Sequence, residues 1–127
     1  MKKIFNDVRR LPEFEKDLKK LSKKFKSLDE DLGNFLKTAL KLRHKLNIDN
    51  HSIVQIANLG IEYPKIYKAR KFACKALKGK GAMSGIRVIY AYYEKEDIVE
   101  LIELYYKADQ ANEDRERIVN HYKLLTR

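Results

Sequence analysis

The stretch IRVIYAYY (residues 86–93), followed by EKED (94–97) and IVELIELYY (98–106), decides the fold of this chain. The first and last segments are rich in β-branched and aromatic residues, which favour extended backbone. The four residues between them are all charged, as in a solvated turn. The pattern predicts two strands, 86–93 and 98–106, paired as an antiparallel hairpin.

A further strand is expected before this hairpin. Pro64 opens the segment 65–72, whose residues are typical of a strand. If the segment is extended, Lys68 and Arg70 lie on one face, because side chains alternate between the two faces of a sheet. Glycines at residues 79–85 predict a turn between this strand and the hairpin.

Two helices are expected in the first third of the chain. Apolar residues recur at spacings of four, three and four within residues 12–26, with lysines outside the stripe, which predicts an amphipathic helix. Ser27 and Glu30 form a capping-box pattern at the start of a second helix, about 28–46. Because the connection is short, the helices are expected to form an antiparallel hairpin. Residues 47–63 are then a connecting segment that packs on the core.

The two ends of the chain complete the expected architecture. An apolar beginning at residues 4–8 predicts a short N-terminal strand. Residues 112–125 predict a C-terminal helix whose apolar face carries Ile118, Tyr122 and Leu125. The element order predicts a single α+β domain over residues 1–127. Its N-terminal strand and helical hairpin pack on a mainly antiparallel sheet of about four strands, with a C-terminal helix and all helices on one face.

The charge of the chain indicates a polyanionic partner. Its 127 residues include 28 Lys and Arg against 18 Asp and Glu, a net charge of +10. Residues 64–93 hold 8 basic residues and 0 acidic ones. A surface that binds phosphates is weakened by nearby carboxylates, so this stretch is the expected contact with the partner. A solvated basic face without a partner remains the alternative.

Several kinds of chemistry are poorly supported by the sequence. Cys74 is the single cysteine, which excludes a disulfide within the chain and a zinc site built from cysteines. The three histidines fall in different expected elements and lack the spacing of metal ligands. No glycine-rich phosphate loop precedes a helix. We therefore expect no metal and no small-molecule cofactor.

No apolar run approaches the ~18 residues of a membrane span. The first residues also lack the apolar segment of a signal peptide. We expect a cytoplasmic protein without a membrane partner.

Cationic and phenolic side chains gather on the expected strands. Such a set can bind a phosphodiester and stabilise the negative charge of its transition state without a metal, because RNA supplies its own 2′-hydroxyl as nucleophile. A lysine crowded by other cations has a lowered pKa and can carry a proton. Tyrosines can stack a base, or pack in the core instead. The set comprises Lys68, Arg70, Arg87, Tyr105, Tyr106 and Lys107.

Short motifs at these positions resemble a known family. The runs are IYKAR (66–70), LKG (77–79), SGIRVIY (84–90), LYYKAD (104–109) and NEDRERI (112–118). Together they resemble the RelE/ParE superfamily of bacterial toxins, and FEKDLKKL (14–21) is similar to the family's opening helix. The resemblance covers residues 12–125. Its most specific part is Ser-Gly-Ile-Arg entering an aromatic strand.

The resemblance implies a RelE-like fold and, in the RelE and HigB-like branch, a ribosome-dependent endoribonuclease. Such a toxin cuts mRNA without a metal and is neutralised by an antitoxin encoded beside it. The resemblance implies that Arg87 stabilises the transition state and that Lys68 carries a proton or clamps a phosphate. Arg70 stands where the best-known members have a second lysine, and arginine is a poor base. Tyr106 and Lys107 fall near the family's catalytic strand end.

We expect RNA to follow the stretch that lacks carboxylates. The side chains expected to bind it are Lys71, Lys75, Lys78, Lys80 and Tyr90.

Two other functions remain open for the same fold. A ParE-like inhibitor of DNA gyrase acts by binding a protein and does not need catalytic cations. A catalytically inactive module that binds nucleic acid or antitoxin is the third reading. The Arg115–Leu125 helix and the helical hairpin are candidate docking sites for an antitoxin segment.

Overall fold

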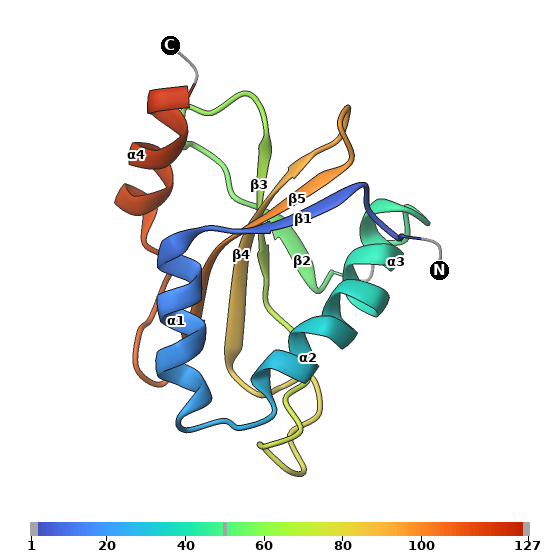
Figure 1. Ribbon diagram of the computed structural model, residues 1–127, viewed down its shortest axis with the longest axis vertical. Coiled ribbons are helices and arrows are strands. Elements are labelled where there is room, and N and C mark those ends of the chain that lie inside the picture. Colours follow the sequence, from blue (N-terminus) through green and yellow to red (C-terminus); the bar gives the residue numbers. More distant parts are fainter. Residues whose placement is uncertain (1–2, 50, 126–127) are drawn as a thin grey trace.

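The hairpin predicted over residues 86–106 lies at the centre of a five-stranded sheet (Figure 1). The structure is a computed structural model that describes residues 3–49 and 51–125. Strand β4 (Ile86–Tyr93) pairs antiparallel with β5 (Ile98–Tyr106), as expected. The order of strands across the sheet is β1-β5-β4-β3-β2.

The outer strands make the sheet wider than expected. β3 (Lys65–Ala69) pairs antiparallel with β4, and β2 (Ile53–Gln55) adds to β3 at one edge. At the other edge β1 (Asp7–Arg10) runs parallel to β5. The sheet is therefore mixed and has five strands rather than about four. The extra strand comes from the segment 47–63, which was expected to be only a connection.

The helices lie close to their predicted positions. α1 (Pro12–Ser22) is followed by α2 (Leu28–Phe35), a π-helical turn η1 (Leu36–Leu40) and α3 (Lys41–His44). The last three follow one another without a break and correspond to the helix predicted over 28–46. Figure 1 shows that α1 and the continuous helical segment from α2 to α3 spread apart from the loop that joins them. They therefore form an open pair rather than the closely packed antiparallel hairpin that was expected. No helix formed by the described residues is long and apolar enough to cross a membrane.

The capping box predicted at Ser27 and Glu30 is wrong. Ser27 has helical backbone angles and makes no capping hydrogen bond. Its Oγ instead donates to Asp31 Oδ2 at 2.7 Å and accepts from the Ala76 amide at 2.8 Å. Glu30 forms an ion pair with Lys75. Both side chains thus attach α2 to the loop between β3 and β4, a long-range contact that local pattern could not indicate.

Helices cover both faces of the sheet rather than one. On the first face, α1 and α2 bury Phe14, Leu18 and Leu32 against the sheet. On the second face, Ile118 and Tyr122 of α4 (Arg115–Leu125) pack on a separate apolar cluster. The side chain of Leu125, predicted on this apolar face, lies outside the described residues. β4 is buried at nearly every position, which is typical of a strand covered on both sides.

Candidate active site

Strand register brings Lys68, Arg87 and Tyr105 to one face of the sheet. Arg87 pairs directly with Tyr105, and Lys68 pairs with Ile89, two residues further along β4. Ile89 and Tyr105 belong to the cluster under α4, so all three functional side chains lie on the α4 face. Diagonal neighbours of this kind are ~7–8 Å apart, within reach of one phosphodiester for side chains as long as Lys and Arg.

A β-bulge in β5 and the N-cap of α4 fix the position of the segment just before α4, which covers this face. Ile89 pairs with Glu103 whereas Tyr90 pairs with Leu101, so β5 carries an extra residue at this point. The buried Glu103 carboxylate accepts the Asp114 amide at 2.8 Å. Asp114 Oδ1 in turn accepts the Arg117 amide at 3.0 Å and caps α4. The segment just before α4 is thereby held above Lys68.

Lys68 is paired with a carboxylate from that segment. Its Nζ lies 3.0 Å from Glu113 Oε1, and the two side chains are only 17% and 12% exposed. Burial acts to lower the pKa of Lys68, but the hydrogen bond to Glu113, the charge of Glu113 and the nearby Tyr105 phenol outweigh burial and raise this pKa. The pKa of Glu113 is lowered, because Lys68 and Arg115 outweigh the opposing effect of burial. Lys68 is therefore a fixed positive charge, and the expectation of a lowered pKa is wrong.

Arg87 has no such partner. Its side chain is half-buried and makes one long hydrogen bond, 3.5 Å from Nη1 to the carbonyl oxygen of its neighbour Ile86. Among the described residues, no carboxylate forms an ion pair with it. A guanidinium with free donors can bind a phosphate through two parallel hydrogen bonds.

Tyr105, rather than Tyr106, is the phenol that faces these cations. Tyr105 is buried, and its hydroxyl has no hydrogen-bond partner among the described residues. Burial raises the pKa of Tyr105, and the positive charge of Lys68 opposes this only in part, so the phenol stays protonated and can donate. Sequence alone could not choose between the adjacent tyrosines, because the choice depends on which of them pairs with Arg87.

Tyr106, expected as a catalytic residue at the strand end, lies on the face of the sheet opposite to Arg87. Its ring contacts Phe25 with centroids 5.0 Å apart, and Lys24 Nζ lies 4.9 Å from its centroid. It also covers the turn that leads into β4. A Cβ added to Gly85, which has φ +86°, would lie 3.3 Å from the Tyr106 ring, so only glycine fits there.

Arg70 and Lys107 flank the site at the end where β4 begins. Arg70 is exposed just beyond β3 and donates from Nη2 to the carbonyl oxygen of His51 at 2.8 Å. Lys107 is exposed just beyond β5, and its amide donates to the Gly85 carbonyl oxygen at 2.8 Å. The backbone therefore places both residues at the same end of the sheet as Arg87.

The expected RNA-binding residues divide into exposed and buried ones. Lys71, Lys78 and Lys80 are exposed in the loop before β4, and Lys75 is exposed but paired with Glu30. Tyr90 is fully buried on the opposite face of the sheet and cannot stack a base, so that expectation is wrong. Its apolar surroundings follow from the burial of β4 on both faces.

No three His, Cys, Asp or Glu side chains of the described residues come together as a possible metal site. Cys74 is buried beside the Ser27 hydroxyl, at 3.7 Å. On the α4 face, Arg87 and the Tyr105 hydroxyl offer donors without a carboxylate partner among the described residues, whereas Lys68 is already paired with Glu113.

Comparison with known proteins adds one structural likeness. No protein-family model matches the chain, and no curated protein matches it. The archaeal RelE-RelB complex from Pyrococcus horikoshii OT3 is similar to it in structure, with 18% sequence identity and a TM-score of 0.48. The match covers 80% of this chain and 93% of that chain.

Proposed function

We propose that the protein is a toxin of a toxin–antitoxin system that cleaves mRNA on the ribosome. The observation that carries this proposal is the pairing of Arg87 with Tyr105 on a face that also holds Lys68. Arg87 has no counter-ion among the described residues, so a phosphate can take that place. The sequence motifs around these residues resemble those of RelE-like toxins, which adds the ribosome and mRNA as the target and an antitoxin as the partner.

The proposed reaction uses the RNA as its own nucleophile. The 2′-hydroxyl loses its proton to solvent as its oxygen attacks the adjacent phosphorus. The bond from phosphorus to the 5′-oxygen breaks, and this oxygen takes up a proton from solvent. The products end in a 2′,3′-cyclic phosphate and a 5′-hydroxyl. Negative charge grows on the non-bridging oxygens in the transition state, where Arg87 donates to them. Displacement of Glu113 by the phosphate would free Lys68 as a second positive charge. It would also uncover the buried Tyr105 hydroxyl, which would then donate a hydrogen bond.

The Lys68–Glu113 ion pair supports a second candidate function that needs no catalysis. A lysine that is largely buried and already neutralised is less available for catalysis than a free one. This observation favours a ParE-like inhibitor of DNA gyrase, or a catalytically inactive module, in which the same face binds a protein.

Mapping the 5′ ends of mRNA in cells that express the protein without its antitoxin distinguishes the two candidates. The proposal predicts new 5′ ends inside translated codons, and predicts their loss in Arg87→Ala. Arg9→Ala is the matched control, because Arg9 is an exposed arginine on β1 whose loss changes the net charge equally. Growth arrest with DNA damage and without new mRNA ends would instead support the gyrase inhibitor.

A further inference from the structure

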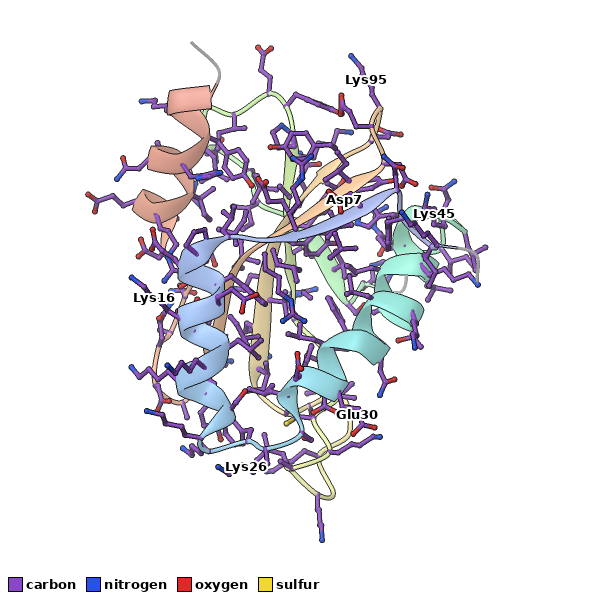
Figure 2. All side chains as sticks on the ribbon, in the orientation of Figure 1. Asp7, Lys16, Lys26, Glu30, Lys45 and Lys95 are labelled. Atoms are coloured by element: carbon purple, nitrogen blue, oxygen red, sulfur yellow. The ribbon has the colours of Figure 1, made fainter. Side chains whose placement is uncertain are left out.

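A second site lies at the other end and on the other face of the sheet. Here α3, the start of β3 and the end of β4 enclose a cavity of about 280 Å³. Figure 2 shows Lys95, beside this cavity, at the same end of the molecule as Lys45, which follows α3. The cavity is five residues along β4 from Arg87, or ~17 Å in an extended strand. The side chains that matter are Arg43, His44, Lys65, Tyr67, Tyr92 and Lys95.

The cations of this cavity lack counter-ions. The Arg43 guanidinium lies 5.6 Å from the centroid of the Tyr67 ring and makes no hydrogen bond or ion pair to the described residues. Its Nε is buried without an acceptor. Lys65 is exposed and likewise forms no ion pair with the described part of the chain. The one carboxylate on the wall, Glu94, pairs with none of these cations.

The side chain of Arg43 is half-buried, and its Nε–H is costly to leave unpaired, because burying this donor forfeits its hydrogen bond to water. Buried polar groups in native proteins are nearly always paired, so an unpaired one calls for an explanation such as an absent ligand. Arg43 therefore indicates that the cavity receives an acceptor.

The neutral groups on the wall also present donors. The Tyr67 ring is buried, but its hydroxyl has no hydrogen-bond partner among the described residues. Burial raises the pKa of Tyr67, so the phenol remains a donor. His44 adds no charge: burial, with the positive charges of Arg43 and Lys45, lowers its pKa to about 4. Its Nε2 is occupied by the Tyr90 hydroxyl at 2.6 Å.

The rest of the wall is aromatic. Tyr63, Tyr67 and Tyr92 contribute ring surface, which suits a planar group beside the charged one. The volume of about 280 Å³ lies just below the ~300–1,000 Å³ that is typical of small-molecule sites. A single nucleotide-sized ligand is therefore a better fit than a strand of RNA.

We propose that this cavity binds a small molecule that carries a phosphate group on a planar ring system, of which a nucleoside monophosphate is the simplest example. The phosphate lies against Arg43, Lys65 and the Tyr67 hydroxyl, and the ring lies against the tyrosines. The site shares no residue with the proposed RNA-cleaving face and does not depend on that function.

Calorimetric titration of the purified full chain with adenosine 5′-monophosphate tests the proposal, with adenosine and inorganic phosphate as comparison ligands. We expect the monophosphate to bind at least about tenfold more tightly than adenosine, because only it meets the unpaired cations. Arg43→Ala is expected to weaken it by about tenfold or more. Lys41→Ala, the control on the same helix, removes an exposed cation outside the cavity and is expected to leave the affinity within about twofold.

Equal affinities for adenosine and its monophosphate would overturn the proposal. So would an equal loss in Lys41→Ala and Arg43→Ala, because that result means diffuse attraction to a basic protein. Tyr67→Phe keeps the ring and removes only the hydroxyl. It replaces Arg43→Ala as the test variant if circular dichroism shows that Arg43→Ala is unfolded. A loss of about threefold or more is expected for Tyr67→Phe, and unchanged affinity contradicts the placement of the phosphate.

Discussion

At the scale of single residues, the Lys68–Glu113 ion pair sets the state of the proposed active site. The pair holds Lys68 protonated and satisfies it with a carboxylate that stands where a phosphate is expected. If RNA binds here as proposed, it has to compete with Glu113 for the lysine, and we expect the ion pair to weaken RNA binding.

Glu113→Gln tests this competition. The substitution keeps the shape of the side chain and removes its charge, so we expect RNA affinity to rise by about fivefold, equivalent to ~1 kcal/mol. Fluorescence anisotropy with a labelled single-stranded RNA measures the change. Glu116→Gln, an exposed site in the first turn of α4, is the control with the same change of charge. An affinity that does not rise above the control would mean that Glu113 does not compete with RNA.

His44 makes stability depend on pH. Burial and neighbouring cations lower its pKa from 6.5 to about 4, so the unfolded chain binds a proton between these values and the folded chain does not. The free energy of unfolding is therefore expected to fall by roughly 1–2 kcal/mol from pH 7 to pH 5 through this group. Urea unfolding at the two pH values measures it. In His44→Gln, whose side chain can still accept a hydrogen bond from Tyr90, the free energy of unfolding should decrease less between pH 7 and pH 5. An unchanged decrease would mean that other groups cause the pH dependence.

At the scale of elements, Asp17 and Arg117 join two helices across an edge of the sheet. The pairing of β1 with β5 ends at Leu101. Beyond this residue, the side chains of Asp17 and Arg117 form hydrogen bonds with backbone groups on the uncovered edge of β5. The Leu104 amide donates to Asp17 Oδ2 at 3.1 Å, and Arg117 Nη1 donates to the Ile102 carbonyl oxygen at 3.1 Å. Asp17 and Arg117 pair at 2.8 Å. They hold α1 and α4, which cover opposite faces, in one arrangement.

Arg117→Met is expected to lower the free energy of unfolding by about 2–3 kcal/mol, because it leaves a largely buried carboxylate unpaired. Arg9→Met breaks the pair with Asp7, in which both side chains are about half exposed, and should cost less than about 1 kcal/mol. Urea unfolding of both variants provides the comparison. Equal losses would show that the Asp17 link adds nothing beyond a surface pair.

The elements that could be predicted are those with strong local signals. β4 and β5 are long and rich in β-branched residues, and α1 has a regular apolar stripe. The bounds predicted for these elements are therefore close to those in the structure. β2 was missed because its three residues form a strand only through pairing with β3. Which of Tyr105 and Tyr106 lies beside Arg87 could not be predicted, because it depends on the register of β4 on β5. Apolar residues on both faces of β4 could have indicated that helices cover both faces.

At the scale of the whole molecule, two separate candidate surfaces carry basic side chains within a chain of net charge +10. One is the α4 face with Lys68 and Arg87, bordered by the exposed lysines of the loop before β4. The other is the cavity beside Arg43, on the opposite face and at the opposite end of β4. The carboxylate-free stretch 64–93 contributes to both. A count along the sequence could not separate them, because alternate residues of one strand face opposite sides of the sheet.

Cleavage of ribosome-bound mRNA by the purified protein and by Arg87→Ala tests the proposed function most directly. The proposal predicts cuts by the wild-type chain that leave a 2′,3′-cyclic phosphate, and none where the nucleotide before the cut is 2′-deoxy. It predicts a rate lower by about 100-fold or more for Arg87→Ala, the usual loss when a donor to transition-state charge is removed. Equal cleavage by a folded Arg87→Ala, or cleavage at 2′-deoxy positions, would contradict the proposed site and its chemistry.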